Sequence, residues 1–472
     1  MTVSTKRQDI IWGYISTGLN IGSGLIMLPV VLHLLSVEEV GIWFVFITLA
    51  GFAQILEGGF LSTFTRNTAY VYGGAQSLLH EGLAASTTKG TPLNLQLLAD
   101  LFAASRIIYR RLAGLALVGL IGGGTYYLST IMTGKQDVMY YYYSWWSFAI
   151  GYIVALYYGY YTAILQGRGD IAKANKVITI TRGSFLIIAT LSLILGFGLL
   201  GIGVASLISC ILGRIFARMY YLDFSRPEVS DIEHIQPEPI RIIKTVWHNS
   251  RRLCLVTFST FLIQRASILL ASSFLGLKVA ASFGMTLTIL ITLTGISTVF
   301  LQIHMPHMST LQSKGDNISL RAVLGETFIV GWFTYLAIFV PLFFLGEPVL
   351  SLISSKVTLL PDYQLLALGI IFFLELNTGI SGGYLTTTNK IPYVQAVFWS
   401  GFTIVVAEAC LLAYSDLGVW SLIIAHGGVQ LSWNYWKWFK ESLAHVGGGL
   451  QELLKGGARR ILLLLEYKAN NV

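Results

Sequence analysis

The stretch LCLVTFSTFLIQRASILLASSFL, which runs from Leu253 to Leu275, is apolar almost throughout and contains one charged side chain, Arg265. At about 1.5 Å of rise per residue, a helix of this length crosses a hydrocarbon core about 30 Å thick and places Arg265 near its middle. A cation at that depth costs roughly 2.5–3.5 kcal/mol on insertion scales. We therefore expect Arg265 to face protein or water rather than lipid.

The composition extends this pattern to the whole chain. Of the 472 residues, 54% are hydrophobic and only 11% are charged, whereas soluble domains average about 25% charged residues. These values predict an all-helical integral membrane protein. The apolar run that follows Lys6 and Arg7 ends without a small-residue cleavage site, so we interpret it as the first span rather than a signal peptide. Three scattered cysteines predict neither a disulfide framework nor a metal site.

Hydropathy predicts twelve spans. They lie at 10–34, 41–63, 112–131, 141–165, 183–200, 202–221, 253–275, 281–303, 327–349, 364–387, 394–414 and 418–438.

Basic residues are distributed unevenly over the predicted loops. Of 31 Lys and Arg residues, 27 fall on the side of the N-terminus, Arg265 lies inside a span, and three fall on the opposite side: Lys135, Lys278 and Lys356. The positive-inside rule then predicts that both termini are cytoplasmic. The net charge of +8 follows from this topology and does not indicate nucleic-acid binding.

A polar, proline-bounded segment, Pro227 to Pro239, divides the twelve predicted spans six and six. A weak internal repeat supports the same division, because GVASLI at 203–208 and GVWSLI at 418–423 are identical at five of six positions. We therefore expect two pseudo-symmetric six-helix lobes. The predicted domains are an N-terminal lobe (1–225), a cytoplasmic linker (226–250), a C-terminal lobe (251–440) and a cytoplasmic basic tail (441–472).

Within this tail, residues 450–466 have the pattern of a basic amphipathic helix. Such a helix would lie on the inner leaflet, and a partly disordered end is the alternative. His304 and His307 have a metal-like spacing, but the proline between them argues against a rigid site, so we expect no metal.

Four stretches carry a resemblance to a known family. They are LSVEEVGIWFVFITLAGF (35–52), ILEGGFLSTFTRNTAY (55–70), LQGRGDIAKANKV (165–177) and MPHMSTLQSKGD (305–316). Together with the two predicted lobes, they resemble the multidrug/oligosaccharidyl-lipid/polysaccharide (MOP) exporter superfamily, and within it the chain is most similar to the O-antigen (Wzx-type) polysaccharide flippases. The chain departs from this pattern at Glu57, where such proteins often have aspartate.

The resemblance implies a MATE-like fold and a transporter rather than an enzyme. The implied substrate is an undecaprenyl-diphosphate-linked oligosaccharide, an O-antigen or related repeat unit. It would be flipped from the cytoplasmic to the periplasmic leaflet of a bacterial inner membrane by alternating access. The implied partners are this lipid-linked glycan, membrane lipid and other polysaccharide assembly proteins. No cofactor is expected beyond a coupling ion, H⁺ or Na⁺.

Charged residues at membrane depth are the candidate functional residues. Glu375 lies at the same predicted depth as Arg265, and two interpretations stay open: the two form an ion pair, or Arg265 binds the diphosphate through its bidentate guanidinium. Glu57 would be a coupling acid, or a group that caps a helix or snorkels. Glu408 would bind a coupling cation or pair with His426.

Three further arginines lie near the predicted cytoplasmic mouth, namely Arg66, Arg182 and Arg214. Topology alone accounts for such charges, and an electrostatic funnel that recruits the diphosphate is the alternative interpretation.

Two other functions compete with the flippase. A cation-coupled multidrug antiporter of the same superfamily would favour an acidic cavity, whereas a flippase should have a cationic one. Three acids and one arginine at membrane depth leave this choice open. A membrane glycan polymerase or acyltransferase would need clustered catalytic residues or a sizeable outer loop, and the sequence has neither.

Overall fold

The computed structural model describes residues 7–78, 93–134, 137–222, 232, 234–387 and 392–469. Throughout these residues the chain is helical, with no strand, so the predicted all-α fold is confirmed. Two compact units divide the chain, Met1–Phe261 and Leu262–Val472. Residues 226–231 and 233 of the predicted linker lie outside the described residues, and its last part, from Ile240, belongs to a helix that continues to Gln264. The lobe boundaries drawn from the sequence stay a prediction.

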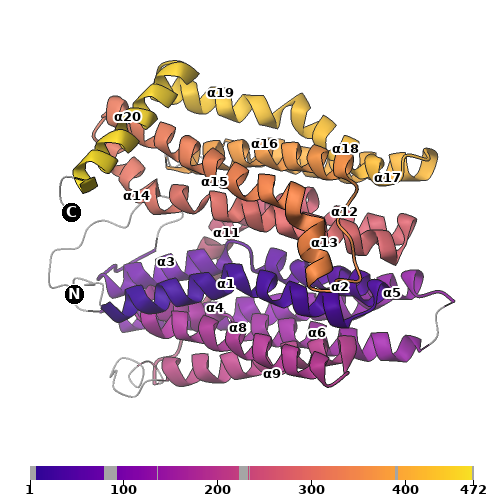
Figure 1. Cartoon of the computed structure of the whole chain (residues 1–472). Coiled ribbons are helices and arrows are strands. Elements are labelled where there is room, and N and C mark those ends of the chain that lie inside the picture. The colour runs from indigo at the N-terminus through magenta and orange to yellow at the C-terminus, as the bar shows by residue number, and fades with distance from the viewer. Residues whose placement is uncertain are drawn as a thin grey trace. The chain divides into compact units, whose positions relative to one another are not determined.

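The N-terminal unit is a bundle of helices in which α6 and α8 pack on α9, and α1 packs on α8 (Figure 1). Its elements are α1 (Arg7–Leu34), α2 (Val37–Glu57), α3 (Phe60–Tyr72), α4 (Leu95–Ala116), the π-helical segment η1 (Leu117–Gly124), α5 (Thr125–Ile131), α6 (Val138–Tyr157), α7 (Tyr160–Gly167), α8 (Ile171–Ile194), α9 (Gly198–Tyr221) and most of α11 (Ile240–Gln264).

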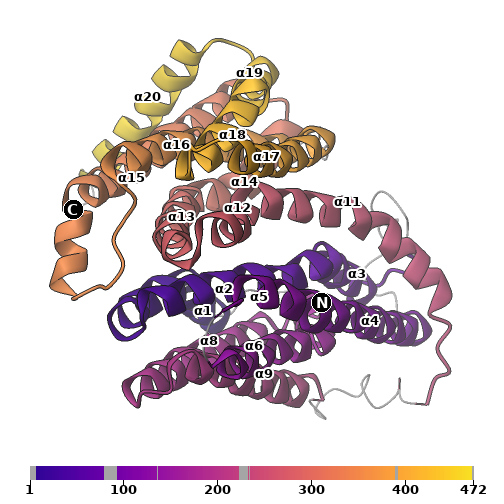
Figure 2. The same cartoon turned by 90° about the vertical axis from the view of Figure 1, so that its right-hand side faces the viewer.

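The C-terminal unit is a second helical bundle, in which α17 packs on α18 and α16 packs on α19 (Figure 2). Its elements are the end of α11, α12 (Ala266–Leu270), the π-helical segment η2 (Ala271–Leu275), α13 (Leu277–Ser297), α14 (Val299–Ser313), α15 (Asn317–Leu352), α16 (Asp362–Thr386), α17 (Val394–Tyr414), α18 (Val419–Ser432), α19 (Asn434–Val446) and α20 (Leu450–Ala469).

Ten helices in the described part of the chain are long and apolar enough to cross a membrane, and eleven if the bent pair Ser250–Gln264 and Ala266–Leu275 forms one span. The predicted twelfth span, 418–438, is interrupted at Trp433, where the backbone leaves the helical region. The part before this break, α18, has 14 residues and at about 1.5 Å each would cover about 21 Å. Hydropathy does not register such a backbone break.

Two helices begin well before the predicted spans. Asn94 caps α4, accepting a bond from the Leu97 amide (2.9 Å), so the helix starts well before the span predicted at 112–131. Asp316 caps α15 in the same way through the Ser319 amide (3.0 Å), and bonds from Ser319 lower the pKa of Asp316. Hydropathy detects only the apolar part of each helix, whereas capping residues set where it starts.

The second span of the N-terminal unit is broken at Gly58 and Gly59, between α2 and α3. Gly59 adopts φ = 76°, and a Cβ atom there would lie 2.5 Å from the Cβ of Leu253 in α11. Glycine is needed for both the left-handed backbone and this close approach. The α11 helix also bonds to the break, because the Cys254 thiol donates to the Gly58 carbonyl (2.6 Å).

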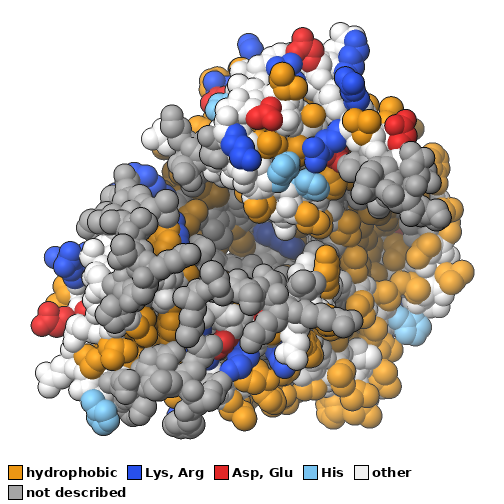
Figure 3. Space-filling view, turned by 90° about the vertical axis from the view of Figure 1, so that its left-hand side faces the viewer, with side chains coloured by type: hydrophobic (Ala, Val, Ile, Leu, Met, Phe, Trp, Pro, Cys, Tyr) orange, Lys and Arg blue, Asp and Glu red, His pale blue; other side chains and the backbone are white. Residues whose placement is uncertain are grey.

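The C-terminal helix α20 packs against the beginning of α15 through small residues. Gly325 and Gly457 bring the two backbones into contact, as small residues do in membrane helix pairs. Arg460 donates to the buried carboxylate of Glu326 at 2.6 Å. Figure 3 faces the end of the C-terminal unit where α20 lies and shows basic and acidic side chains gathered there. The structure thus places residues 450–466 against protein, which neither sequence interpretation of this tail anticipated.

Candidate functional site

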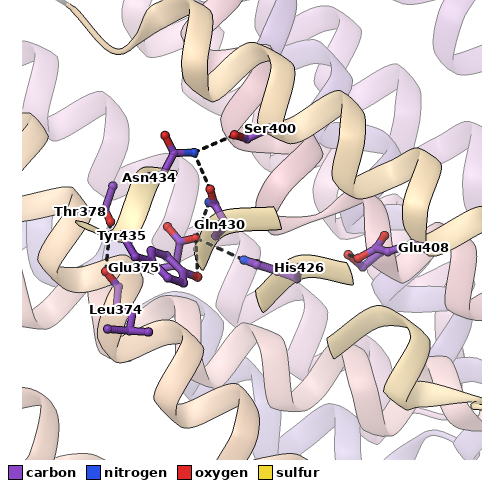
Figure 4. A network of polar contacts seen from close by, with 10 residues as sticks. Leu374, Glu375, Thr378, Ser400, Glu408, His426, Gln430, Asn434 and Tyr435 are labelled. Atoms are coloured by element: carbon purple, nitrogen blue, oxygen red, sulfur yellow. Dashed lines mark hydrogen bonds and ion pairs between the residues drawn. The ribbon is translucent and has the colours of Figure 1, made fainter. Parts of the chain in front are cut away.

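The carboxylate of Glu375, in the middle of α16, is at the centre of a polar network in the C-terminal unit (Figure 4). One of its oxygens, Oε1, lies 2.6 Å from the amide nitrogen of Gln430, 3.1 Å from the Tyr435 hydroxyl and 3.2 Å from Nε2 of His426. The Glu375 side chain is 11% exposed. A carboxylate with several donors at membrane depth can hold either a negative charge or a bound cation.

The partners of Glu375 come from two consecutive helices. His426 and Gln430 lie one turn apart on α18, and Tyr435 lies on α19, just after the break at Trp433. All three are buried. The backbone break between the helices therefore brings side chains from two segments onto one carboxylate.

A second layer of polar groups surrounds Gln430. The side-chain nitrogen of Asn434 lies 2.6 Å from Oε1 of Gln430 and 2.8 Å from the Ser400 hydroxyl of α17. The indole nitrogen of Trp438 donates to Oδ1 of Asn434 at 2.8 Å. The network thus joins α16, α17, α18 and α19.

Arg265 lies at the break between α11 and α12. Its backbone angles, φ −128° and ψ −30°, interrupt the helix, and the two parts are bent by 44°. Its guanidinium contacts the Thr288 hydroxyl of α13 at 3.4 Å and makes further contacts. The side chain is half-buried, and its position relative to water and lipid stays a prediction.

Glu408, in the middle of α17, has no solvent exposure. Its Oε1 accepts a hydrogen bond from Ser267 of α12 at 2.7 Å, whereas Oε2 has no hydrogen-bond partner among the described residues. The sequence offered His426 as one possible partner of Glu408, whereas the structure places the His426 ring on Glu375 (Figure 4).

The N-terminal unit has its own half-buried acid. Glu57 is the last residue of α2, directly before the Gly58–Gly59 break, and accepts a hydrogen bond from the Tyr109 hydroxyl of α4 at 3.3 Å. The Arg214 guanidinium on α9 donates to Thr162 of α7 (2.9 Å), and Gly159, three residues before Thr162, lies beside Oε1 of Glu57. The structure therefore joins two predicted site residues in one polar cluster.

The other two predicted arginines lie at the edge of this cluster or outside it. Arg182, on α8, follows Thr181, whose side chain packs on Gly213 beside Arg214, so Arg182 lies near the cluster. Arg66, on α3, is exposed, and no recorded contact joins it to Glu57 or Arg214. The funnel of arginines stays a prediction.

The predicted pair of Arg265 and Glu375 is not among the recorded contacts. The groups that contact Glu375 are an imidazole, an amide and a phenol. Sequence reasoning missed Gln430, Asn434 and Trp438, although a signal was present. With His426 they are spaced four residues apart, which is the spacing of side chains along one helix face.

No group of three or more His, Cys, Asp or Glu side chains able to hold a metal occurs in the described residues. His304 lies inside α14, where its ring contacts the Phe300 carbonyl (3.0 Å) and stacks on the Phe300 ring.

Among known proteins, only solved structures are similar to this chain. No family model matches the chain, and no curated protein matches it. Among solved structures, the chain is similar to an inward-facing multidrug resistance MATE family transporter of the MOP superfamily, with a TM-score of 0.69 and 14% identity over 93% of this chain and 98% of that chain. The chain has the fold of MATE transporters.

Two more solved structures share this MATE fold. An outward-facing multidrug resistance MATE transporter gives a TM-score of 0.58 at 15% identity, and a MOP transporter from Pyrococcus furiosus, described as having a binding pocket of reverse polarity, gives 0.54 at 14%. Each comparison covers 93% of this chain and 94% of the other. All three structures are of transporters rather than enzymes. The expected MOP-type fold is thereby confirmed, while the number of spans and the sides of the termini are not.

Proposed function

We propose that this chain is a cation-coupled membrane transporter and that Glu375 with His426 forms its coupling site. One observation carries the proposal, namely a half-buried carboxylate contacted by three side chains from two segments that meet at a helix break. Ionisable groups inside a membrane domain are costly and are retained mainly for function. The MATE fold supports transport in general.

In this proposal, Glu375 binds the coupling cation, H⁺ or Na⁺, and the donors around it stabilise the carboxylate after the cation leaves. The Tyr435 hydroxyl and the His426 ring either donate to the charged carboxylate or turn their lone pairs toward a bound cation. Each state of Glu375 therefore favours a different arrangement of α18 and α19. A difference of this kind is what couples ion binding to a conformational change.

The first candidate cargo is an organic cation or drug, exported in exchange for the coupling cation across a bacterial inner membrane. Two of the three solved structures named above are described as multidrug resistance transporters. Acids inside predicted spans, Glu57 in the N-terminal unit and Glu375 and Glu408 in the C-terminal unit, favour a cationic cargo.

The second candidate cargo is the undecaprenyl-diphosphate-linked oligosaccharide. Arg265 favours it, because a half-buried guanidinium at a helix break in the middle of a span offers the fork that binds diphosphate. In this case Arg182, Arg214 and Arg66 would recruit the lipid from the cytoplasmic side, and polysaccharide assembly proteins would be partners.

Glu375→Gln tests the coupling site. We expect transport driven by a cation gradient to fall at least tenfold in proteoliposomes, because the amide cannot carry the exchangeable charge. Glu441→Gln is the control, since Glu441 is a more exposed acid that pairs with Lys437 on α19. Gradient-driven transport by Glu375→Gln equal to that of Glu441→Gln would remove Glu375 from the coupling site.

Arg265 separates the two cargoes. If the cargo is the lipid-linked glycan, Arg265→Ala should abolish surface glycan in a flippase-deficient host, and Arg265→Lys should be clearly impaired because ammonium lacks the bidentate fork. If the cargo is a drug cation, both variants should keep ethidium efflux and the wild type should not restore glycan. Normal glycan display by Arg265→Ala cells would contradict the diphosphate role of Arg265.

A further inference from the structure

Three side chains form a hydrogen-bonded chain that ends on Glu375. Trp438, Asn434 and Gln430 lie four residues apart, and the contacts between them are 2.8 Å and 2.6 Å long, followed by 2.6 Å to Glu375. All three side chains are at most 5% exposed. The chain crosses the break at Trp433, with Gln430 before it and the other two residues after it.

The hydrogen bonds between these side chains can run from donor to acceptor in only one consistent direction. An indole N–H can donate but cannot accept, so Trp438 must face the carbonyl oxygen of Asn434. The Asn434 amide then turns its NH₂ group toward Gln430 and Ser400. Gln430 in turn must accept with its oxygen and present its NH₂ group to Glu375 (Figure 4). The indole N–H of Trp438, which can only donate, thereby fixes which end of the Asn434 amide and of the Gln430 amide carries the oxygen.

The direction matters at the carboxylate. An NH₂ group toward Oε1 stabilises the charged, cation-free carboxylate, whereas the carbonyl of a flipped Gln430 would favour a protonated or cation-bound Glu375. We propose that Trp438 and Asn434 are positioning residues that hold Gln430 as a donor to Glu375 and thereby favour release of the coupling cation. This inference rests on the proposed function of Glu375 and assigns to the α18–α19 break the control of its charge state.

Trp438→Phe tests the direction of the chain. Phenylalanine keeps an aromatic ring against Tyr393 but removes the N–H, which frees both amides to flip. The readout is the rate at which dicyclohexylcarbodiimide labels Glu375 at one fixed pH in nanodiscs, because this reagent reacts with the neutral carboxylic acid. We expect labelling to rise about tenfold, since a hydrogen bond to a charged group contributes enough for that change.

The same helix offers a matched control. Trp436 donates its indole N–H to the Ser432 carbonyl and is half exposed. Trp436→Phe therefore removes a tryptophan N–H but leaves the hydrogen bonds to Glu375 unchanged. Labelling of Glu375 in this variant should equal labelling in the wild type. Glu57 in the N-terminal unit is the internal control, because general loosening of the protein would raise labelling of both acids. Equal labelling of Glu375 in the two tryptophan variants would overturn the proposal.

A double-mutant cycle shows whether Trp438 acts through the amides. In an Asn434→Leu background the hydrogen bonds between Trp438 and Gln430 are already broken, so Trp438→Phe should cause no further change in the labelling of Glu375. If Asn434→Leu does not fold, Gln430→Leu takes its place with the same expectation. An unchanged effect of Trp438→Phe in either background would refute the proposed relay.

Labelling does not require transport, so the two proposals can fail separately. Unchanged cation-driven transport in Glu375→Gln would refute the proposed function. The role of Trp438 and Asn434 would be refuted only by the labelling of the tryptophan and amide variants.

Discussion

At the scale of single residues, Glu375 and Glu408 show how differently one residue type can be placed in one membrane unit. Glu375 has three polar partners on one oxygen. Glu408 is fully buried with a single hydroxyl donor and one oxygen without a partner in the described part of the chain. Burying a charge without sufficient partners is costly. The sequence ranked both acids as candidates and could not distinguish their surroundings.

The surroundings of Glu408 lead to a stability prediction. Glu408→Gln should raise the thermal unfolding midpoint in detergent by a few degrees, because a neutral amide keeps an acceptor for Ser267 and removes a group whose charged form is poorly compensated. A change of about 1 kcal/mol corresponds to about 2–4 °C in larger domains. Ser267→Ala should lower the midpoint by a similar amount. A lower midpoint for Glu408→Gln would show that the carboxylate charge is compensated by groups outside the recorded contacts.

At the scale of elements, helix ends and breaks decide where functional groups lie. Glu57 directly precedes the Gly58–Gly59 break, Arg265 lies in the break between α11 and α12, and the Glu375 network spans the break at Trp433. Broken helices free backbone and side-chain groups inside a membrane protein and often mark transport sites. The sequence analysis predicted none of these breaks, although the first one lies at a pair of glycine residues.

A helix end also explains Arg168, which the sequence assigned only to the positive-inside count. Its guanidinium donates to the carbonyls of Tyr220 and Tyr221 at the end of α9 and pairs with Asp170 at 2.7 Å. The side chain is fully buried. Because C-terminal carbonyls lack partners within the helix and carry partial negative charge, a cation there stabilises the helix end.

Arg168→Ala should therefore reduce the free energy of unfolding by about 3 kcal/mol, the usual consequence of breaking a buried ion pair. Lys173→Ala is the matched control. Lys173 reaches the same Asp170 at 3.8 Å but is 31% exposed, so its loss should cost below about 1 kcal/mol. Denaturant unfolding in mixed micelles measures both values. Similar losses for the two variants would contradict the capping role of Arg168.

At the scale of the whole molecule, the C-terminal helix α20 is part of the packed C-terminal unit. It contacts α15 through Gly325 and Gly457 and through the Glu326–Arg460 pair. A second pair, Arg321 with Glu452, lies one turn earlier along α15. The contact depends on small residues in two segments more than a hundred residues apart.

Gly457→Leu should displace α20, because the added side chain would meet the backbone of Gly325 and Glu326. We expect trypsin to cut at Arg459 and Arg460 about tenfold faster, which corresponds to about 1.4 kcal/mol of lost docking. The neighbouring Ala458 is exposed, so Ala458→Leu should leave the cleavage rate unchanged. Equal cleavage of the two variants would show that Gly457 does not hold α20 in place.

The sequence by itself determined the class of the protein and its candidate charges. Apolar runs and few charges were enough to predict an all-helical membrane protein, because the cost of burying polar backbone and charge in lipid leaves few other structures. The MOP-type fold was implied by the resemblance of four stretches to that superfamily. The same cost picked out Arg265, Glu57, Glu375 and Glu408, since any charge inside an apolar run stands out.

Only the tertiary structure decided the partners of these charges. Partners depend on helix breaks and on rotations of helices about their axes, which hydropathy does not report. His426 could have faced Glu408 or Glu375 until the register of α16 and α18 was known. The donor direction from Trp438 to Gln430 likewise depends on the contact geometry, because the sequence does not show whether the oxygen or the NH₂ group of an amide faces its neighbour.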